Sequence, residues 1–207
     1  MAQYFKIHSQ NPQPRLIHQG VQILRSGGLL VYPTDSSYAL GCHLDDKAAV
    51  ERIRRIRKLD RHHNFTLVAS DLKQVAQFAK IDNEQYRLIK ALTPGAYTFI
   101  LAAKRLVPNR LVHPKRRTIG IRIPDHAIVQ AIVSELGEPI MSSSLILPDQ
   151  DQVMADPQLI RTQLEHDVDL VIDGGVGTLE PSTVIDWHED RLNIIRLGAG
   201  DISFLEN

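Results

Sequence analysis

The feature of this sequence that most constrains its fold is the regular alternation of amphipathic helical segments with short apolar runs. In residues 14–26, apolar side chains such as Ile17 and Val21 recur at the spacing of one helical face. The pair Gly27–Gly28 ends this segment, and the apolar run at residues 29–32 is typical of a buried strand. Repeated along the chain, this alternation predicts an α/β fold.

The same pattern continues to the C-terminal end of the sequence. Further helices are expected at residues 47–58, 71–80, 83–92, 126–136 and 157–165. Strands are expected at residues 29–32, 38–42, 65–69, 97–103, 118–123, 140–143, 170–172, 183–187 and 192–196. No internal repeat and no linker rich in Pro, Gly or Ser divides these segments. We therefore predict one α/β domain over residues 1–207, with a mixed sheet and flanking helices.

The composition is that of an ordinary globular protein, with 43% hydrophobic and 23% charged residues in a chain of 207. The longest apolar runs, residues 27–32 and 97–103, are far shorter than the roughly 20 residues that cross a bilayer. The first residues lack the apolar core of a signal peptide, and the single Cys42 cannot form an internal disulfide. We expect a cytoplasmic protein without a membrane partner, in which Cys42 is a small core residue.

The charges are segregated along the chain although the net charge is zero, with 24 Lys and Arg against 24 Asp and Glu. Residues 104–117 hold six basic side chains and no acid, and residues 47–61 hold seven against Glu51 and Asp60. Residues 135–190 hold thirteen acids against one base. Either the basic runs create a local positive field for an anionic partner, or they are solvated faces paired with the acidic second half.

The well-defined catalytic and metal-binding motifs are missing from this sequence. It contains no phosphate loop that ends in Gly-Lys-Ser/Thr, no nucleophile elbow and no His-Glu-x-x-His. The nine histidines lack the spacing of a zinc site, and the adjacent His62 and His63 would point in different directions on a helix or strand. We therefore name no catalytic residue and no metal site.

Three weaker features are candidates for anion binding. The glycine-rich residues 173–177 follow a strand and form either an anion-binding loop or a plain turn. The hydroxyl groups of residues 142–144 and 181–183 lie at predicted strand ends, where ligands of open α/β sheets usually bind. Arg122 interrupts an apolar strand, so its guanidinium faces either a cleft, where it could clamp a carboxylate or phosphate, or a paired acid.

Six segments, taken together, resemble the YrdC-like family, which contains the threonylcarbamoyl-AMP synthases. The segments are GGLLVYPTDSSYALGC at residues 27–42, TPGAYT at 93–98, TIGIRIP at 118–124, DGG at 173–175, PSTVID at 181–186 and IRLG at 195–198. Their order and spacing make the resemblance highly specific, and it covers nearly the whole chain. It implies a single domain with a twisted α/β sheet and a large, positively lined concavity.

The resemblance also implies a chemistry and a set of binding residues. Family members that are enzymes convert ATP, bicarbonate and L-threonine into threonylcarbamoyl-adenylate and pyrophosphate, which supplies tRNA modification. ATP and Mg²⁺ are therefore the cofactors to expect if this chain is an enzyme. Thr34 falls where the family contacts threonine, and the other positions carried over contact substrate or nucleotide. The predicted nucleotide and substrate residues are Thr34, Lys58, Arg61, Arg122, Ser144, Ser182 and Arg196. Because most lie at strand ends or adjoining loops, we expect them to converge on one concave surface.

The sequence departs from the family enzymes at two positions. The enzymes usually carry Lys-x-Arg followed by Pro, whereas this chain has Lys58, Leu59, Asp60 and Arg61. The family's Ser-Ala-Asn falls on Ser144, Leu145 and Ile146, where an apolar side chain replaces the amide. An acid near polyphosphate and a lost amide both weaken phosphate binding.

Two functions remain open after this comparison. The first is binding of double-stranded RNA or tRNA through the basic runs, which contain no Phe, Tyr or Trp for base stacking. The predicted RNA-binding residues are Arg52, Arg54, Arg55, Lys104, Arg105, Arg110, Lys115, Arg116 and Arg117. The alternative is a threonylcarbamoyl-AMP synthase or a related enzyme that hydrolyses the adenylate. In both cases the concavity could hold ATP or an AMP ester.

Overall fold

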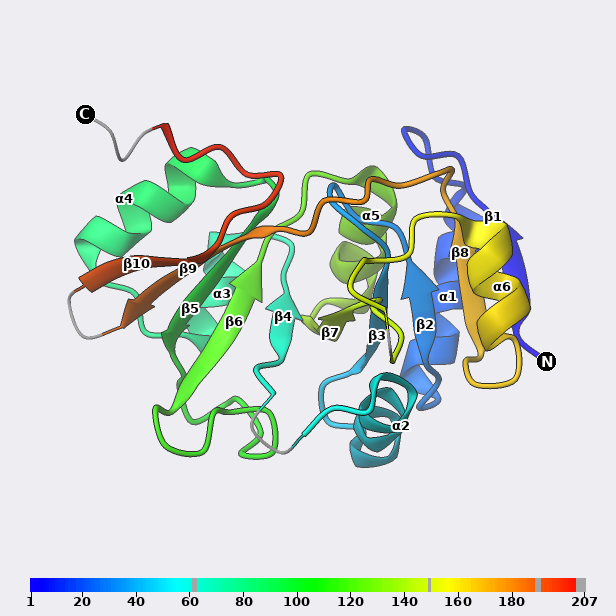
Figure 1. Ribbon diagram of the computed structural model, residues 1–207, viewed down its shortest axis with the longest axis horizontal. Helices are drawn as coiled ribbons and strands as arrows, with labels where there is room; N and C mark the ends of the chain where they lie inside the picture. The colour runs from blue at the N-terminus through cyan, green and yellow to red at the C-terminus, as the bar shows by residue number, and fades with distance from the viewer. Residues whose placement is uncertain (61–62, 149, 189–190, 204–207) are drawn as a thin grey trace.

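The computed structural model of the chain describes residues 1–60, 63–148, 150–188 and 191–203 (Figure 1). Its strands are β1 (Gln3–Lys6), β2 (Leu30–Tyr32), β3 (Ala39–His43), β4 (Thr66–Val68), β5 (Tyr97–Ala102), β6 (Thr118–Arg122), β7 (Ile140–Ser144), β8 (Leu170–Asp173), β9 (Thr183–His188) and β10 (Arg191–Arg196). They form one mixed sheet in the order β1-β8-β2-β3-β7-β4-β6-β5-β9-β10. This arrangement confirms the predicted α/β fold.

Four of the six described helices begin after an Asp whose side chain caps them. The helices are α1 (Pro14–Arg25), α2 (Lys47–Arg57), α3 (Leu72–Phe78), α4 (Asn83–Leu92), α5 (Ala127–Leu136) and α6 (Pro157–Leu164). The Asp46 side chain accepts a hydrogen bond from the Ala49 N–H at the start of α2, and Asp82 with Gln85 forms a capping box on α4. Helix α2 ends where Lys58 adopts a left-handed conformation with φ of 49°.

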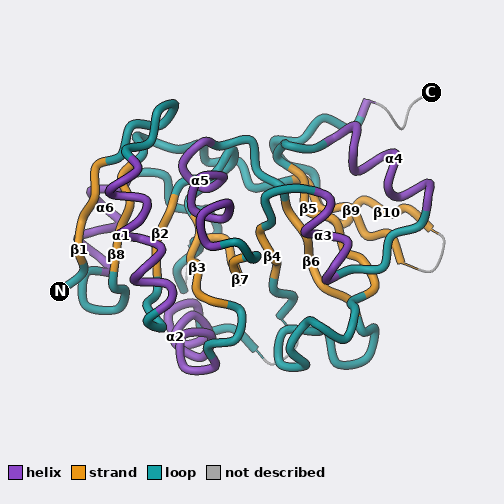
Figure 2. The backbone as a smooth tube through the Cα atoms, turned by 180° about the vertical axis from the view of Figure 1, so that it is seen from behind, coloured by secondary structure: helices purple, strands orange, loops and turns teal. Residues whose placement is uncertain are grey.

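The helices cover different faces along the sheet because alternate residues of each strand point to opposite sides. Leu30 and Tyr32 of β2 pack with α1 and α5, whereas Val31 belongs to a larger cluster with residues of α2, α3, α4 and α6. Figure 2 shows α1 and α5 next to each other over the β2 and β3 end of the sheet. Cys42 is fully buried in the larger cluster, as predicted.

Strand β1 is the one described element that the sequence analysis did not predict. Its four residues, QYFK, pair in parallel with β8. A segment this short carries no usable periodicity, and its ends are exposed. Its position in the sheet is set by the partner strand and by the backbone hydrogen bond from Ala2 N to Glu165 O.

Two ion pairs join the basic first half of the chain to the acidic second half. Arg52 on α2 donates to Asp169, with 2.7 Å between Arg52 Nη1 and Asp169 Oδ2. Arg116 in the loop after β5 pairs with the buried Asp186 of β9. At Arg52 and Arg116, therefore, the basic runs pair with the acidic part of the chain, which is the second of the two alternatives raised by the sequence. None of the helices within the described ranges is long and apolar enough to span a membrane.

We expect Asp169→Ala to lower the free energy of unfolding by about 1–2 kcal/mol, the usual loss for charged hydrogen bonds at a partly exposed site. Asp169 Oδ2 accepts from both Arg52 and the Leu29 N–H at 2.7 Å, so the change loosens α2 and the start of β2 together. Urea denaturation monitored by circular dichroism measures the effect. The matched control is Asp167→Ala, because Asp167 contributes its backbone carbonyl to Arg52. Equal losses in both variants would contradict the prediction.

Candidate functional site

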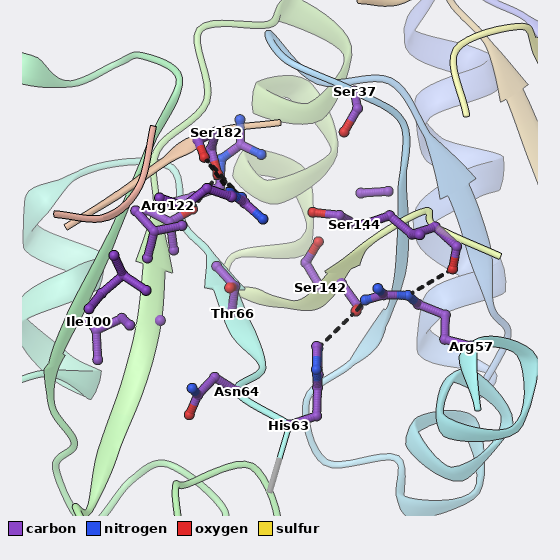
Figure 3. Close-up of a pocket in the computed structure, with 18 residues that line it drawn as sticks. Ser37, Arg57, His63, Asn64, Thr66, Ile100, Arg122, Ser142, Ser144 and Ser182 are labelled. Carbon is purple, nitrogen blue, oxygen red and sulfur yellow. Dashed lines mark hydrogen bonds between the residues drawn. The ribbon is translucent and has the colours of Figure 1, made fainter. Parts of the chain in front are cut away.

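A pocket opens where the sheet carries small side chains on one face of five neighbouring strands (Figure 3). Its floor follows the pairing register: Ser144 lies opposite Ala39, Thr66 lies opposite both Ser142 and Gly120, and Gly120 lies opposite Ile100. Paired residues point to the same side, so these short side chains gather on one face and leave space above it. The hollow is therefore a consequence of register.

The pocket is lined by polar and cationic side chains together with a few aliphatic ones. The lining residues are Ser37, Ala39, Arg57, His63, Asn64, Thr66, Thr98, Ile100, Gly120, Arg122, Ser142, Ser143, Ser144, Ile146, Ser182, Val184, Ile195 and Arg196. None of these described lining residues is acidic. The positively lined concavity expected from the sequence is present.

Three guanidinium groups reach the pocket from separate elements, namely Arg57 at the end of α2, Arg122 at the end of β6 and Arg196 at the end of β10. Burial, together with the nearby Arg196, lowers the pKa of Arg57 to about 10. Burial and the nearby Arg122 also lower the pKa of Arg196. Like charges repel one another, so three guanidinium groups at one hollow favour an anionic ligand between them.

Arg122 is fixed by an ion pair with Asp35 from the loop before β3. The two side chains are only 8% and 10% exposed, and Asp35 also accepts a hydrogen bond from the Asp125 N–H at 2.7 Å. The Nε of Arg122 is buried and has no hydrogen-bond partner among the described residues. Both sequence interpretations of Arg122 therefore hold, because its guanidinium is paired with an acid and also lines a pocket.

Arg196 is anchored by the segment that precedes β9. Its Nε and Nη2 donate to the Ser182 carbonyl at 3.2 and 2.9 Å. The Ser182 hydroxyl is 2.7 Å from the Thr98 hydroxyl of β5. These contacts hold one cation and two hydroxyl groups on the same pocket wall.

Arg57 and His63 meet at Ser143 on β7. Arg57 Nε donates to the Ile146 carbonyl at 3.1 Å, and its Nη1 donates to Ser143 Oγ. His63 Nε2 lies 3.5 Å from the same Oγ. Burial lowers the pKa of His63 to about 4, with further lowering by Arg57 and Arg54 and partial offset by Asp60. His63 is therefore a neutral imidazole at physiological pH.

The structure brings four of the seven predicted nucleotide and substrate residues into this pocket. They are Arg122, Ser144, Ser182 and Arg196. Thr34 lies behind the lining, where its hydroxyl donates to the carbonyl of Ser37, a lining residue, at 2.7 Å.

The other two predicted positions are Lys58 and Arg61. Lys58 is exposed at the left-handed end of α2 and is outside the lining, where Arg57 is found instead. Lys58 thus lies one position past the arginine that reaches the lining, and its part in nucleotide binding stays a prediction. Arg61 and His62 fall outside the described residues.

The sequence analysis missed Arg57, His63 and Asn64 in this pocket. Arg57 belongs to the same run of basic residues as the other arginines of α2. Only its position around the helix directs its side chain into the pocket. His63 and Asn64 lie in a polar stretch without periodicity, so nothing in their pattern indicated a pocket.

The glycine-rich residues 173–177 form a turn outside this pocket. The Tyr38 hydroxyl donates to the Gly175 carbonyl at 2.7 Å and accepts from the Gly174 N–H at 3.2 Å. Asp173 Oδ1 accepts from the Gly175 N–H at 2.9 Å. Because these backbone groups are bonded within the protein, the plain turn is the better interpretation.

The predicted RNA-binding residues gather around α2 and the loop between β5 and β6, which lie along the same lower edge in Figure 1. Arg54 donates to the Arg110 carbonyl at 3.4 Å, and Arg110 donates to the Leu44 carbonyl at 2.7 Å, so the two segments are in contact. Arg54 also stacks on the Phe65 ring at 4.6 Å. We name this surface the basic edge, defined by residues 52–55 and 104–117.

Several cations of the basic edge hold the fold together. Besides Arg52 and Arg116, which pair with acids, Lys104 Nζ donates to the Ala76 carbonyl at 2.5 Å and Arg117 Nη2 donates to Asn109 Oδ1 at 3.1 Å. The side chains of Arg55, Arg105 and Lys115 are exposed. The basic edge therefore combines structural contacts with solvent-facing charge.

Comparison with known proteins places the fold and its motifs in a family. Residues 22–198 match the Sua5/YciO/YrdC family model, which is described as "Telomere recombination". YciO of Escherichia coli K12 is 50% identical over 202 residues, covering 98% of each chain. Its crystal structure superposes with a TM-score of 0.94, at 51% identity over 97% of this chain and 98% of that one.

More distant relatives carry a described activity or ligand. The threonylcarbamoyl-AMP synthase of Vibrio vulnificus is 29% identical over 180 residues, which is 85% of this chain and 96% of that protein. The crystal structure of P. abyssi Sua5 complexed with L-threonine has a TM-score of 0.90 at 23% identity. That match covers 98% of this chain and 59% of Sua5, and it shows a shared fold.

We expect Asp35→Asn to lower the free energy of unfolding by about 3 kcal/mol, because it leaves the buried Arg122 charge without its counterion. Chemical denaturation measures this loss. Pyrophosphate should raise the melting temperature of this variant more than that of the wild type, since an anion in the pocket supplies the missing negative charge. Asp125→Asn is the control, because Asp125 contributes its backbone N–H to Asp35. Unchanged stability of Asp35→Asn would show that the ion pair is unimportant.

Proposed function

Because the chain belongs to the Sua5/YciO/YrdC family, we propose that its arginine-lined pocket binds an adenine nucleotide and makes or hydrolyses threonylcarbamoyl-AMP. The observation that carries this proposal is the convergence of Arg57, Arg122 and Arg196 on one hollow, with no acid among its described lining residues. Guanidinium groups are suited to phosphate and carboxylate, which they bind with two parallel hydrogen bonds. Threonylcarbamoyl-AMP carries both, since the carboxylate of its threonine is free and its AMP supplies the phosphate.

The remaining lining residues suit the other parts of such a ligand. The hydroxyl groups of Thr66, Ser142, Ser144 and Ser182 can hydrogen-bond a ribose or phosphate oxygen. Ile100, Val184 and Ile195 supply aliphatic contacts of the kind that pack against a base. Among the relatives, the threonylcarbamoyl-AMP synthase of Vibrio vulnificus supports this class of reaction.

The two departures from the family enzymes have different consequences in the structure. Asp60 is exposed and outside the described lining, so its charge does not face the pocket directly. Ile146 does line the pocket, and its carbonyl holds Arg57. The missing amide removes one hydrogen-bonding group from the wall but leaves the arginines in place.

A resident magnesium ion does not fit this lining. Mg²⁺ is usually bound through one or two carboxylates in addition to phosphate oxygens. Asp35, the carboxylate that pairs with the lining residue Arg122, also accepts from the Asp125 N–H. No group of three His, Cys, Asp or Glu that could hold a metal occurs among the residues that were described. We therefore assign phosphate neutralisation to the three arginines.

RNA binding at the basic edge is the second candidate function. The exposed Arg55, Arg105 and Lys115 favour it, because they belong to two segments that touch through Arg54 and Arg110. A row of cations across joined segments can contact successive phosphates of a duplex RNA or tRNA without reading its sequence. We rank it second because Arg52 and Arg116 are already paired with acids of the protein.

We expect Arg196→Gln to weaken binding of AMP and ATP by about 10- to 100-fold, the loss that follows removal of a charged hydrogen bond. Isothermal titration calorimetry measures both affinities. The matched control is Arg191→Gln at the opposite, exposed end of the same strand β10, which should bind like the wild type. Nucleotide binding that is equally strong in both variants would remove Arg196 from the site.

Synthesis is tested separately from binding. Purified protein with ATP, bicarbonate and L-threonine should release pyrophosphate if the chain is a synthase, and Arg196→Gln should slow that release. Nucleotide binding without pyrophosphate above a boiled control would leave hydrolysis of the adenylate as the activity of the pocket.

For the basic edge, we expect Arg105→Glu combined with Lys115→Glu to weaken duplex RNA binding equally for unrelated sequences. Both side chains are exposed, so the melting temperature should stay unchanged. Filter binding over a salt series measures the effect, and log affinity of the wild type should fall by several units per unit of log salt. The absence of wild-type binding to duplex RNA at about 100 mM salt would rule out this function.

A further inference from the structure

Ser143 is the point at which a guanidinium and a neutral imidazole meet in the pocket. Figure 3 shows the dashed contacts from Arg57 and His63 converging on this wall. The three groups come from the end of α2, from the segment before β4 and from β7. The sequence indicated only the hydroxyl cluster at residues 142–144, and in the structure Arg57 and His63 join Ser143 in a hydrogen-bonded chain that lines the cavity.

The direction of these hydrogen bonds follows from the chemistry of the groups. A guanidinium can only donate, so the Ser143 oxygen accepts from Arg57. The hydroxyl proton of Ser143 is then free to point at His63 Nε2, 3.5 Å away, which accepts when the imidazole is protonated on Nδ1. A nucleophile and its base are often this far apart before substrate binds. Edge-to-face packing on the Phe65 ring, with centroids 5.4 Å apart, holds the imidazole plane.

We propose that Ser143 is a nucleophile, with His63 as its proton acceptor, that transfers the acyl group of a bound acyl adenylate to water. This inference rests on the proposed function for the identity of its substrate. Of the two reactions in that proposal, synthesis and hydrolysis, a nucleophilic Ser143 corresponds to hydrolysis through an acyl-enzyme intermediate.

The reaction has two balanced steps. First, Ser143 Oγ attacks the carbonyl carbon of threonylcarbamoyl-AMP, a carbon–oxygen bond to Ser143 forms, and the bond from that carbon to the phosphate oxygen breaks. AMP leaves with the electron pair, and the hydroxyl proton passes to His63 Nε2. Second, after His63 has released that proton to solvent, water attacks the carbamoyl-serine and gives one proton to His63, which passes it to the departing Ser143 oxygen. The carbamic acid of threonine is released and ionises to the carbamate. No oxidant or reductant is needed.

The charges around Ser143 and His63 favour the roles of nucleophile and proton acceptor. The Arg57 guanidinium, hydrogen-bonded to Ser143 Oγ, stabilises the negative charge that develops as the proton leaves. Burial first, and then Arg57 and Arg54 of α2, lower the pKa of His63, and Asp60 opposes them. A bound anion offsets the two arginines, which raises the pKa of His63 from about 4 toward the range of an effective base.

The geometry distinguishes Ser143 from the serine before it. The Ser142 hydroxyl accepts a hydrogen bond from the Tyr32 hydroxyl at 2.7 Å and is therefore engaged by a different neighbour. Ser143 is the member of this run that contacts both a cation and an imidazole. A proton acceptor and an oxyanion-stabilising donor are the two groups that activate a serine.

The test measures AMP release from synthetic threonylcarbamoyl-AMP by the purified full-length chain, against a sample without protein. We expect Ser143→Ala and His63→Gln each to lower the enzymatic rate by about 100-fold or more, the typical contribution of a nucleophile or general base. Ser134→Ala and His166→Gln, exposed residues on α5 and after α6, are the matched controls and should keep the wild-type rate. Acid quenching followed by peptide mass analysis should find the threonylcarbamoyl group on Ser143 in the wild type.

Two further measurements separate this inference from the proposed function. AMP affinity by calorimetry should stay within about threefold of the wild type in both variants, which shows that they fold and bind. The pKa of His63, followed by NMR, should rise when AMP binds. Normal AMP binding with wild-type hydrolysis rates in Ser143→Ala or His63→Gln would overturn the catalytic pair and leave the nucleotide site intact. Failure of the wild type to bind AMP would overturn the proposed function as well.

Discussion

The mutual repulsion of three arginines in one hollow is the constraint around which the rest of this structure is arranged. Arg57, Arg122 and Arg196 come from three distant parts of the chain and are each partly or fully withdrawn from water. The fold holds each of them with oxygen atoms: a carboxylate of Asp35 for Arg122, the Ser182 carbonyl for Arg196 and the Ile146 carbonyl for Arg57. Asp35 is the one acid paired with these three cations among the described residues, so the pocket has an excess of positive charge that an anionic ligand would neutralise.

The space for such a ligand comes from small residues at matched positions of the sheet. Ala39, Thr66, Gly120 and Ser142 lie on one face of neighbouring strands because of the pairing register. A Cβ added at Gly120 would lie 2.7 Å from the Thr66 hydroxyl, so even this small enlargement displaces the floor. Charge and space therefore depend on the same strands, and the hydroxyl groups that remain on the floor are suited to a ligand with many oxygen atoms.

The segregation of charge along the chain has two consequences in the folded protein. Part of the basic first half is neutralised by the acidic second half, through Arg52 with Asp169 and Arg116 with Asp186. Within the described part of the second half, no acid pairs with the arginines of the pocket, and Arg122 pairs with Asp35. The residual positive charge is therefore concentrated in a hollow, where low dielectric strengthens its effect on a ligand, and along an exposed edge, where salt screens it.

The sequence by itself determined the α/β class, the positions of the six helices and nine of the ten described strands, and the burial of Cys42. These follow from local periodicity, capping residues and glycine stops, which act over a few neighbouring positions. It also indicated Arg122 and Ser182 as unusual polar groups at strand ends, and both lie in the pocket. The tertiary structure alone decided that Arg57 faces the pocket and Lys58 does not, since that depends on the phase and end of one helix. It likewise decided that β1 joins the sheet and that His63 reaches Ser143, 80 residues away. Contacts of this kind are set by strand register and packing between distant segments, for which one sequence carries no local signal.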